Sequence, residues 1–251
     1  MEITSFGSLY VGGVPVPARH IVGDNPVISL GNSSPGMEIV WAFNGKMYVA
    51  SRCACVGASW ESLNHAQRGP VSPAGKLVLI DGSPYRSWLL ADSNTVKYGA
   101  PCTWPEILHD AEECGIPELE DGSFWNTKDE AFWGQDAIGY GSHIVWGQGK
   151  PWESWHACSN ERAYGIGYRP ALEPLQVLEL DKGLKKKCLK IYGKDGYVMV
   201  GWYLDSDDYD LIFKRKVGSP FDCSWAKGDL DTMIIDRGAI AWIEKADERT
   251  L

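Results

Sequence analysis

The segment Trp152–Leu172 constrains the fold of this chain most, because its mixture of residues suits neither a helix nor a regular strand. Gly165 and Gly167 would each weaken a helix by about 1 kcal/mol relative to alanine, which argues against a helix here. A glycine also lets another chain or a ligand approach the backbone closely, and the bulky pair Tyr168 and Arg169 follows directly. We therefore predict a loop that leads into a buried strand.

Glycine and proline interrupt the rest of the chain as well, with 28 glycines and 14 prolines among 251 residues. Such a composition favours strands joined by many turns and leaves room for few long helices. The length suits one large domain or two small ones. Tryptophan is unusually frequent: the chain has twelve, and seven of them lie between Trp88 and Trp155. Side chains of this size supply either core or a binding surface.

The charge and the hydropathy of the chain argue against two classes of partner, nucleic acids and membranes. A net charge of −9 repels phosphate backbones, so we expect no nucleic-acid partner, and the short basic run Lys185–Lys187 favours a solvated face. No apolar run approaches the ~18 residues of a membrane helix, and no secretory signal is visible, so we expect no membrane partner. The seven cysteines include no Cys-x-x-Cys pair, which argues against a structural zinc site. Without a secretory signal we expect reduced cysteines in a cytoplasmic protein, and a virion protein released by lysis would have the same features.

Local turn and cap chemistry predicts two hairpins. Asn44-Gly45 and Asp81-Gly82 are strong hairpin-turn pairs, and each lies between two apolar runs. The strands expected on either side of these turns are 37–43 with 46–51, and 76–80 with 85–90.

Two helices are also predicted from their caps. Thr103, followed three positions later by Glu106, forms a capping box that begins a helix over 104–114, and Gly115 ends it. Ser59 is a suitable N-cap for a second, short helix.

We predict three regions along the chain. Residues 1–36 are rich in Gly, Pro and Ser and are expected to form an N-terminal arm or an edge strand. Residues 37–174 form an α+β domain, in which the aromatic segment 118–150 supplies long ordered loops. Residues 175–251 form a small β-rich C-terminal domain, with strands expected at 188–192, 197–204, 211–216, 233–235 and 239–243.

Four motifs occur in an order that resembles a known group of proteins. They are Ile80-Asp81-Gly82 with Tyr85, the helix at Trp104, Phe132-Trp133-Gly134-Gln135-Asp136, and Gly167-Tyr168-Arg169-Pro170. Proteins from phages and integrative elements of gut Firmicutes carry a similar IDG-x-x-Y … FWGQD … GFRPAL signature. The closing motif also resembles the last core strand of formylglycine-generating-enzyme-like and phage tail-tip domains. The resemblance covers about residues 37 to 174 and implies a C-type-lectin-like fold with antiparallel strands and long ligand-binding loops.

The chain departs from the metal sites of that fold. The copper-dependent oxidases use two cysteines five residues apart, whereas here Cys158 is followed at that spacing by Ala163, and a lone thiolate holds copper poorly. The lectins bind sugar through calcium with a Trp-Asn-Asp motif, whereas this chain has Trp125-Asn126-Thr127. The acidic residues of 205–210 lack the glycine and the distant glutamate of an EF-hand loop. We expect no metal and no cofactor.

The candidate site residues are aromatic and basic. As core, the tryptophans supply area that short strands lack; as a platform, they stack on a ligand or a partner's side chains. Arg162 adds a cation for stacking, while Arg169 and Gly167 are expected to have structural roles. The predicted ligand-binding residues are Trp125, Trp133, Trp146, Trp152, Trp155, His156 and Arg162.

The function predicted from these features is non-enzymatic binding of a host protein or ligand by a phage or mobile-element protein, including inhibition of a host defence system. A virion receptor-binding accessory protein is one alternative. The other is an enzyme, either a degenerate formylglycine-generating-enzyme-like oxidase or a hydrolase. His156 and Cys158 would serve such a hydrolase, because residues two apart in a strand share a face. The oligomeric state is left open.

Overall fold

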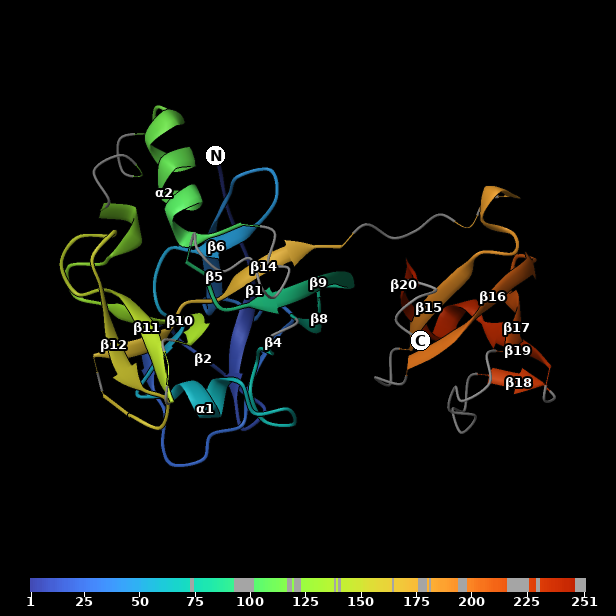
Figure 1. Cartoon of the computed structure of the whole chain (residues 1–251), viewed down its shortest axis with the longest axis horizontal. Coiled ribbons are helices and arrows are strands. Elements are labelled where there is room, and N and C mark those ends of the chain that lie inside the picture. Colours follow the sequence, from blue (N-terminus) through green and yellow to red (C-terminus); the bar gives the residue numbers. More distant parts are fainter. Residues whose placement is uncertain are drawn as a thin grey trace. The chain divides into compact units, whose positions relative to one another are not determined.

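The computed structural model divides the chain into two compact units, Met1–Leu175 and Gln176–Leu251 (Figure 1), and each is described by itself. The structure describes residues 1–72, 75–92, 102–116, 119, 123–137, 139, 141–163, 165–175, 180, 182–193, 198–215, 226–228 and 231–246. Most of the strand pairing is antiparallel and helices are few, which agrees with a β-rich α+β class.

The larger sheet of unit 1 has eight strands in the order β2-β1-β5-β6-β14-β9-β8, with β4 paired to β1. Its strands are β1 (Glu2–Val11), β2 (Val14–Val16), β4 (Ile28–Gly31), β5 (Glu38–Phe43), β6 (Tyr48–Ala50), β8 (Lys76–Ile80), β9 (Ser83–Trp88) and β14 (Ala171–Pro174). The prediction of an N-terminal arm is wrong, because β1 pairs along β5 over Glu2–Ser8 and is part of this sheet, while the alternative of an edge strand is confirmed at β2, which ends the strand order. The strands β2 and β4, which pair with the end of β1, are short and lie in a proline-rich part of the sequence. Proline is uncommon within sheets, so nothing in the sequence indicates that this segment belongs to one.

Both predicted hairpins are confirmed. Asp81 and Gly82 have φ of +50° and +80°, the pair of positive values that a two-residue type I′ turn needs between β8 and β9. At the other hairpin, Oδ1 of Asn44 accepts the backbone N–H groups of Lys46 and Met47 at 3.1 and 2.9 Å and closes the turn between β5 and β6.

The smaller sheet of unit 1 has six strands in the order β12-β11-β10-β13-β7-β3. These are β3 (His20–Ile21), β7 (Cys55–Val56), β10 (Ala131–Ala137), β11 (Ser142–Gly147), β12 (Ser154–Cys158) and β13 (Ile166–Tyr168). The prediction of loops over 118–150 is wrong for its second half, where β10 and β11 form a hairpin. Residues 131 to 136 are buried on both faces of β10, so the strand lacks the alternation by which strands are found in sequence.

The chain passes from one sheet to the other within two residues. The single buried strand predicted at the end of Trp152–Leu172 is two short strands, β13 and β14, separated by Arg169 and Pro170. β13 lies between β10 and β7 of the smaller sheet, and β14 lies between β6 and β9 of the larger.

Both predicted helices are present. α2 (Trp104–Glu113) begins with the expected capping box, in which Thr103 accepts the Glu106 N–H and the Glu106 carboxylate accepts the Thr103 N–H. α1 (Trp60–Leu63) is capped by Ser59, whose hydroxyl accepts the Ser62 N–H. A 3-10 turn, η2 (Ser123–Trp125), follows α2 in the chain.

The second unit contains one six-stranded sheet in the order β18-β19-β17-β16-β15-β20. Its elements are β15 (Cys188–Gly193), β16 (Val198–Ser206), β17 (Asp210–Arg215), β18 (Ala226–Gly228), β19 (Thr232–Asp236), β20 (Ile240–Lys245), and the 3-10 turns η3 (Lys182–Leu184) and η4 (Arg237–Ala239). The five predicted strands are confirmed within two residues at each end, and β18 was not predicted.

Candidate functional site

Three of the predicted binding tryptophans belong to the core. Trp125 and Trp133 have no exposed surface, and Trp146 is 4% exposed. The Trp125 ring meets Trp104 edge-on at 5.2 Å between centroids, and the Trp133 indole N–H donates to the Ala58 carbonyl at 2.8 Å. These side chains supply the packing area that short strands lack, so the prediction that they present a binding surface is wrong for Trp133 and Trp146, while Trp125 is buried but still lines the groove described below.

The remaining two tryptophans differ from each other. Trp155 on β12 is partly buried and packs against the core shared by the two sheets of unit 1. Trp152, three residues earlier, is 61% exposed. A large ring on the surface loses contact with water only when something binds over it, so Trp152 is the strongest candidate of the set.

Trp152 stands at the rim of a groove of about 490 Å³, here called the Trp152 groove. Its lining combines apolar side chains with polar groups and charges of both signs. The lining residues are Leu108, Glu112, Leu119, Ser123, Trp125, Asn126, Thr127, Lys128, Asp129, Gly149, Lys150, Pro151 and Trp152. Three segments far apart in the sequence therefore meet here: α2, the chain around η2, and the turn between β11 and β12.

The turn that carries Trp152 is fastened to both other segments. The Trp104 indole N–H of α2 donates to the Pro151 carbonyl at 2.7 Å. The backbone N–H of Gly149 donates to the Thr127 carbonyl at 2.9 Å. Gly149 also has a φ of +148°, a backbone conformation that residues with a Cβ rarely adopt, which favours glycine at this position. The exposed ring is therefore presented from a fixed backbone.

A charged group lies beside the exposed ring. The Lys150 ammonium is 5.5 Å from the centroid of the Trp152 ring, within the range of a cation–π contact. A cation–π contact at an exposed site contributes about 0.5–1 kcal/mol to this position of the ring.

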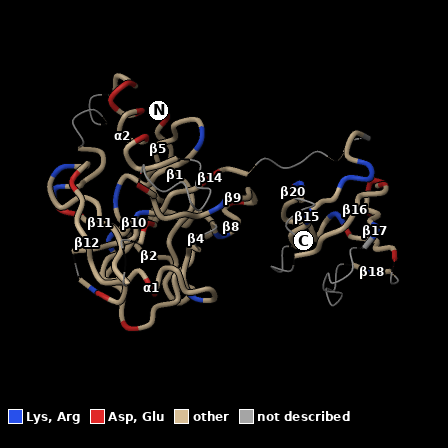
Figure 2. The backbone as a smooth tube through the Cα atoms, viewed as in Figure 1, with Lys and Arg blue, Asp and Glu red and all other residues tan. Residues whose placement is uncertain are grey.

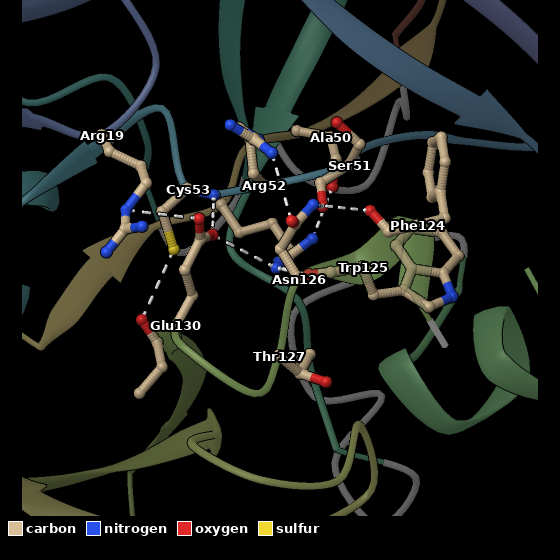
Figure 3. Close-up of polar contacts among 12 residues, drawn as sticks. Arg19, Ala50, Ser51, Arg52, Cys53, Phe124, Trp125, Asn126, Thr127 and Glu130 are labelled. Atoms are coloured by element: carbon tan, nitrogen blue, oxygen red, sulfur yellow. Dashed lines mark hydrogen bonds and ion pairs between the residues drawn. The ribbon is translucent and has the colours of Figure 1, made fainter. Parts of the chain in front are cut away.

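A buried polar cluster holds the backbone at Trp125 and Asn126, two residues that line the groove (Figure 3). Arg169 is fully buried and donates to the carbonyls of Ala50, at 2.8 Å, and Trp125. Its guanidinium lies 3.7 Å from the carboxylate of Glu130, which is 2% exposed. The same carboxylate accepts the Cys53 N–H at 2.6 Å and lies 3.5 Å from Arg19. Burial lowers the pKa of Arg169, although a guanidinium stays protonated.

Cys53 and Gly167 complete the packing of this cluster. Burial, as the largest cause, raises the pKa of the Cys53 thiol well above its ordinary value, so the thiol is neutral. A Cβ at Gly167 would lie 2.5 Å from the Cys55 carbonyl oxygen and 2.8 Å from the Cys53 sulfur. Arg169 and Gly167 thus occupy structural positions.

Asn126 joins the cluster to the groove. Its backbone has a φ of +52°, and its side-chain amide donates to the Phe124 carbonyl at 2.9 Å and to the Ser51 carbonyl at 3.4 Å (Figure 3). The Asn126 Oδ1 accepts from Arg52 at 3.1 Å. These bonds turn the chain sharply after Trp125 and direct Thr127 to Asp129 along the groove.

The other predicted site residues lie outside the groove. His156 and Cys158 are exposed on β12, and no side chain among the described residues hydrogen-bonds to His156. Arg162 donates to the carbonyls of Gly57 and Val22, each at 3.1 Å, and pairs with Asp24. Arg162 thus ties the segment 22–24 to the smaller sheet instead of presenting a free cation.

Sequence reasoning missed the polar part of the groove, Thr127, Lys128, Gly149 and Lys150. The glycine and proline on either side of Lys150 were an available signal, since they indicate a turn directly before Trp152.

Within the described ranges, no group of three His, Cys, Asp or Glu side chains is arranged to hold a metal ion, and no helix is long and apolar enough to cross a membrane. The lysines and arginines of unit 1 are scattered among acidic residues (Figure 2). Comparisons with protein-family models, with curated proteins and with solved structures gave no match.

Proposed function

We propose that this chain is a non-enzymatic binding protein that recognises a partner protein through the Trp152 groove. The observation that carries the proposal is Trp152 itself, 61% exposed on a turn that is hydrogen-bonded to two other segments. Tryptophan is enriched among residues that dominate protein–protein affinity, and a fixed backbone reduces the ordering cost of binding.

The lining of the groove supports a polypeptide partner. Leu108, Leu119 and Trp152 offer apolar contacts, while Lys128 and Asp129 place opposite charges on the same wall. A partner segment with one apolar anchor between polar side chains satisfies both kinds of contact.

The proposed setting follows from the resemblance to phage and mobile-element proteins. In that setting the partner is a host protein, for example a defence enzyme that is inhibited when it binds to the Trp152 groove. The chain would act in the host cytoplasm or in the virion. We also propose that unit 1 is a divergent C-type-lectin-like domain. The order of the β8–β9 hairpin, α2, β10 and the β13–β14 pair supports this, because each carries one of the signature motifs. A crystal structure of unit 1 whose strand order differs from that of C-type-lectin-like domains would refute this proposal.

The test is a quantitative pull-down from a bacterial host lysate with three baits. The wild-type chain and Tyr209→Ala are expected to retain the same host protein, while Trp152→Ala retains at least about tenfold less, as for a hot-spot tryptophan. Tyr209 is a matched control because it is an aromatic of the second unit and is 79% exposed. The captured protein is then purified and titrated by calorimetry against each bait. Equal retention by Trp152→Ala and wild type would refute the groove as the binding site.

A further inference from the structure

The strand β12 lies at one end of the smaller sheet of unit 1 and pairs with β11 alone. Just outside the strand, the backbone carbonyl of Glu153 accepts the Gly147 N–H at 2.9 Å, and the backbone N–H of Ser159 donates to the Gly141 carbonyl at 2.7 Å. Hydrogen-bonded residues alternate along an antiparallel strand, so between these two positions Trp155 and Ala157 also direct their N–H and C=O groups toward β11.

The intervening residues, Ser154, His156 and Cys158, therefore direct their backbone groups away from the sheet. The Cys158 carbonyl accepts the Glu161 N–H at 2.8 Å. The remaining groups, three N–H donors and the carbonyls of Ser154 and His156, have no partner among the described residues. All three residues are exposed, so the edge is open to another strand.

Sheet edges in proteins are usually protected by proline, by charged side chains or by a bulge. β12 contains none of these: its sequence is Ser-Trp-His-Ala-Cys, and its pairing with β11 runs without a register shift. An unprotected edge of this length is a template for strand addition.

We propose that the occupant of this edge is the β12 strand of a second copy of the chain, paired antiparallel across a two-fold axis at His156. The outward-facing residues Ser154, His156 and Cys158 are spaced evenly about His156, as pairing across a two-fold axis requires, and of their six backbone groups the Cys158 carbonyl alone has a hydrogen-bond partner among the described residues. His156 then faces its own counterpart, and Ser154 faces Cys158 of the other copy. Each of the three facing pairs then exchanges two backbone hydrogen bonds. The Cys158 carbonyl can take part although it already accepts the Glu161 N–H, because a carbonyl oxygen has a second lone pair.

The charges near β12 are compatible with this pairing. The strand itself has no charged side chain, and the nearest one, Glu153, would face Ser159 of the other copy rather than a carboxylate. A contact made by five residues from each chain falls below the ~1,200 Å² of stable interfaces, so the dimer is expected to form only at high protein concentration. This inference does not depend on a partner for the Trp152 groove.

A directed disulfide tests the register. Facing hydrogen-bonded residues have Cα atoms about 5.5 Å apart, within the range that a disulfide spans. Ser154→Cys is therefore expected to link to native Cys158 of the second copy under mild oxidation with diamide. The two positions are about 13 Å apart within one chain, so the link can form only between copies. It is read by non-reducing electrophoresis and by mapping the linked peptides.

The matched control is Ser154→Cys with Cys158→Ser, which keeps the new thiol and removes its partner. Linked dimer from the single variant and little from the control would support the register. Equal linking in both, or none in either, would overturn it.

Sedimentation from about 5 to about 500 μM tests the association itself, over the range in which a small interface dissociates. The wild type is expected to shift from monomer toward dimer. His156→Pro removes an outward N–H, leaves the bonds to β11 intact and should stay monomeric with an unchanged circular dichroism spectrum. A wild type that is monomeric throughout would overturn the proposal and leave the edge for a foreign strand. The disulfide arm remains decisive if His156→Pro does not fold.

Discussion

Replacing Arg169 by methionine tests whether the buried polar cluster holds unit 1 together. The guanidinium has no exposed surface, donates to two carbonyls and lies 3.7 Å from Glu130. Methionine leaves the Glu130 carboxylate in the interior, and removal of one partner of a buried pair costs about 3–5 kcal/mol. Arg19 also contacts Glu130, at 3.5 Å, but its side chain is 50% exposed and compensates only in part. We therefore expect Arg169→Met to lower the free energy of unfolding by about 3–5 kcal/mol.

The assay is urea unfolding followed by tryptophan fluorescence, since most tryptophans lie within residues 1–175. Arg52→Met is the matched control, because Arg52 is exposed and its one side-chain hydrogen bond within the described ranges is to Asn126, at 3.1 Å. It should cost less than about 1 kcal/mol. The double variant Arg169→Met with Glu130→Met removes both charges, and its loss should fall short of the sum of the single losses by about 1–3 kcal/mol. A loss below about 1 kcal/mol for Arg169→Met, or strict additivity, would refute this account of the cluster.

Two further predictions concern titration and thiol reactivity. Burial lowers the pKa of His143, which stacks on Trp60 at 3.6 Å between ring centroids, so the unfolded chain binds its proton more readily. Stability should therefore fall as the pH drops below about 6.5, the ordinary value for histidine. Melting temperatures measured as a function of pH should fall less steeply below pH ~6.5 for His143→Phe than for wild type or for the exposed control His109→Gln. The same dependence of melting temperature on pH in all three proteins would contradict the role of His143. Among the cysteines of the described residues, Cys158 is the exposed one and should react first with iodoacetamide, as read by peptide mapping. Burial raises the pKa of Cys55 to about 12, so alkylation of Cys55 in the folded protein before Cys158 would refute the packing around it.

The parts of the fold that sequence predicted are those that local chemistry determines. Asn44-Gly45 and Asp81-Gly82 form their turns with side-chain bonds and positive φ values, and Thr103 caps α2 with a group three residues away. These interactions need no tertiary context. The β10–β11 hairpin is different, because residues 131 to 136 are buried on both faces by packing that arises only in the folded chain.

The candidate site divides in the same way. Gly149 and Pro151 indicate a turn directly before Trp152, but a turn does not give the exposure of the ring that follows it, and the sequence therefore does not show that Trp133 is fully buried and Trp152 61% exposed. The difference arises from tertiary position: Trp133 lies on the inner strand β10, and Trp152 lies on the turn that joins β11 to β12. Sequence could identify the set of aromatic residues but could not sort it into core and surface.

The two-residue passage from β13 to β14 has a consequence for the order in which the protein can fold during synthesis. β13 and β14 are the last strands of unit 1 to leave the ribosome, yet each fills a central place in its sheet. Until Pro174 has emerged, the nascent chain holds two sheets that both lack an inner strand. Folding of unit 1 therefore waits for one short segment and then completes both sheets together, while Gln176–Leu251 is still being translated.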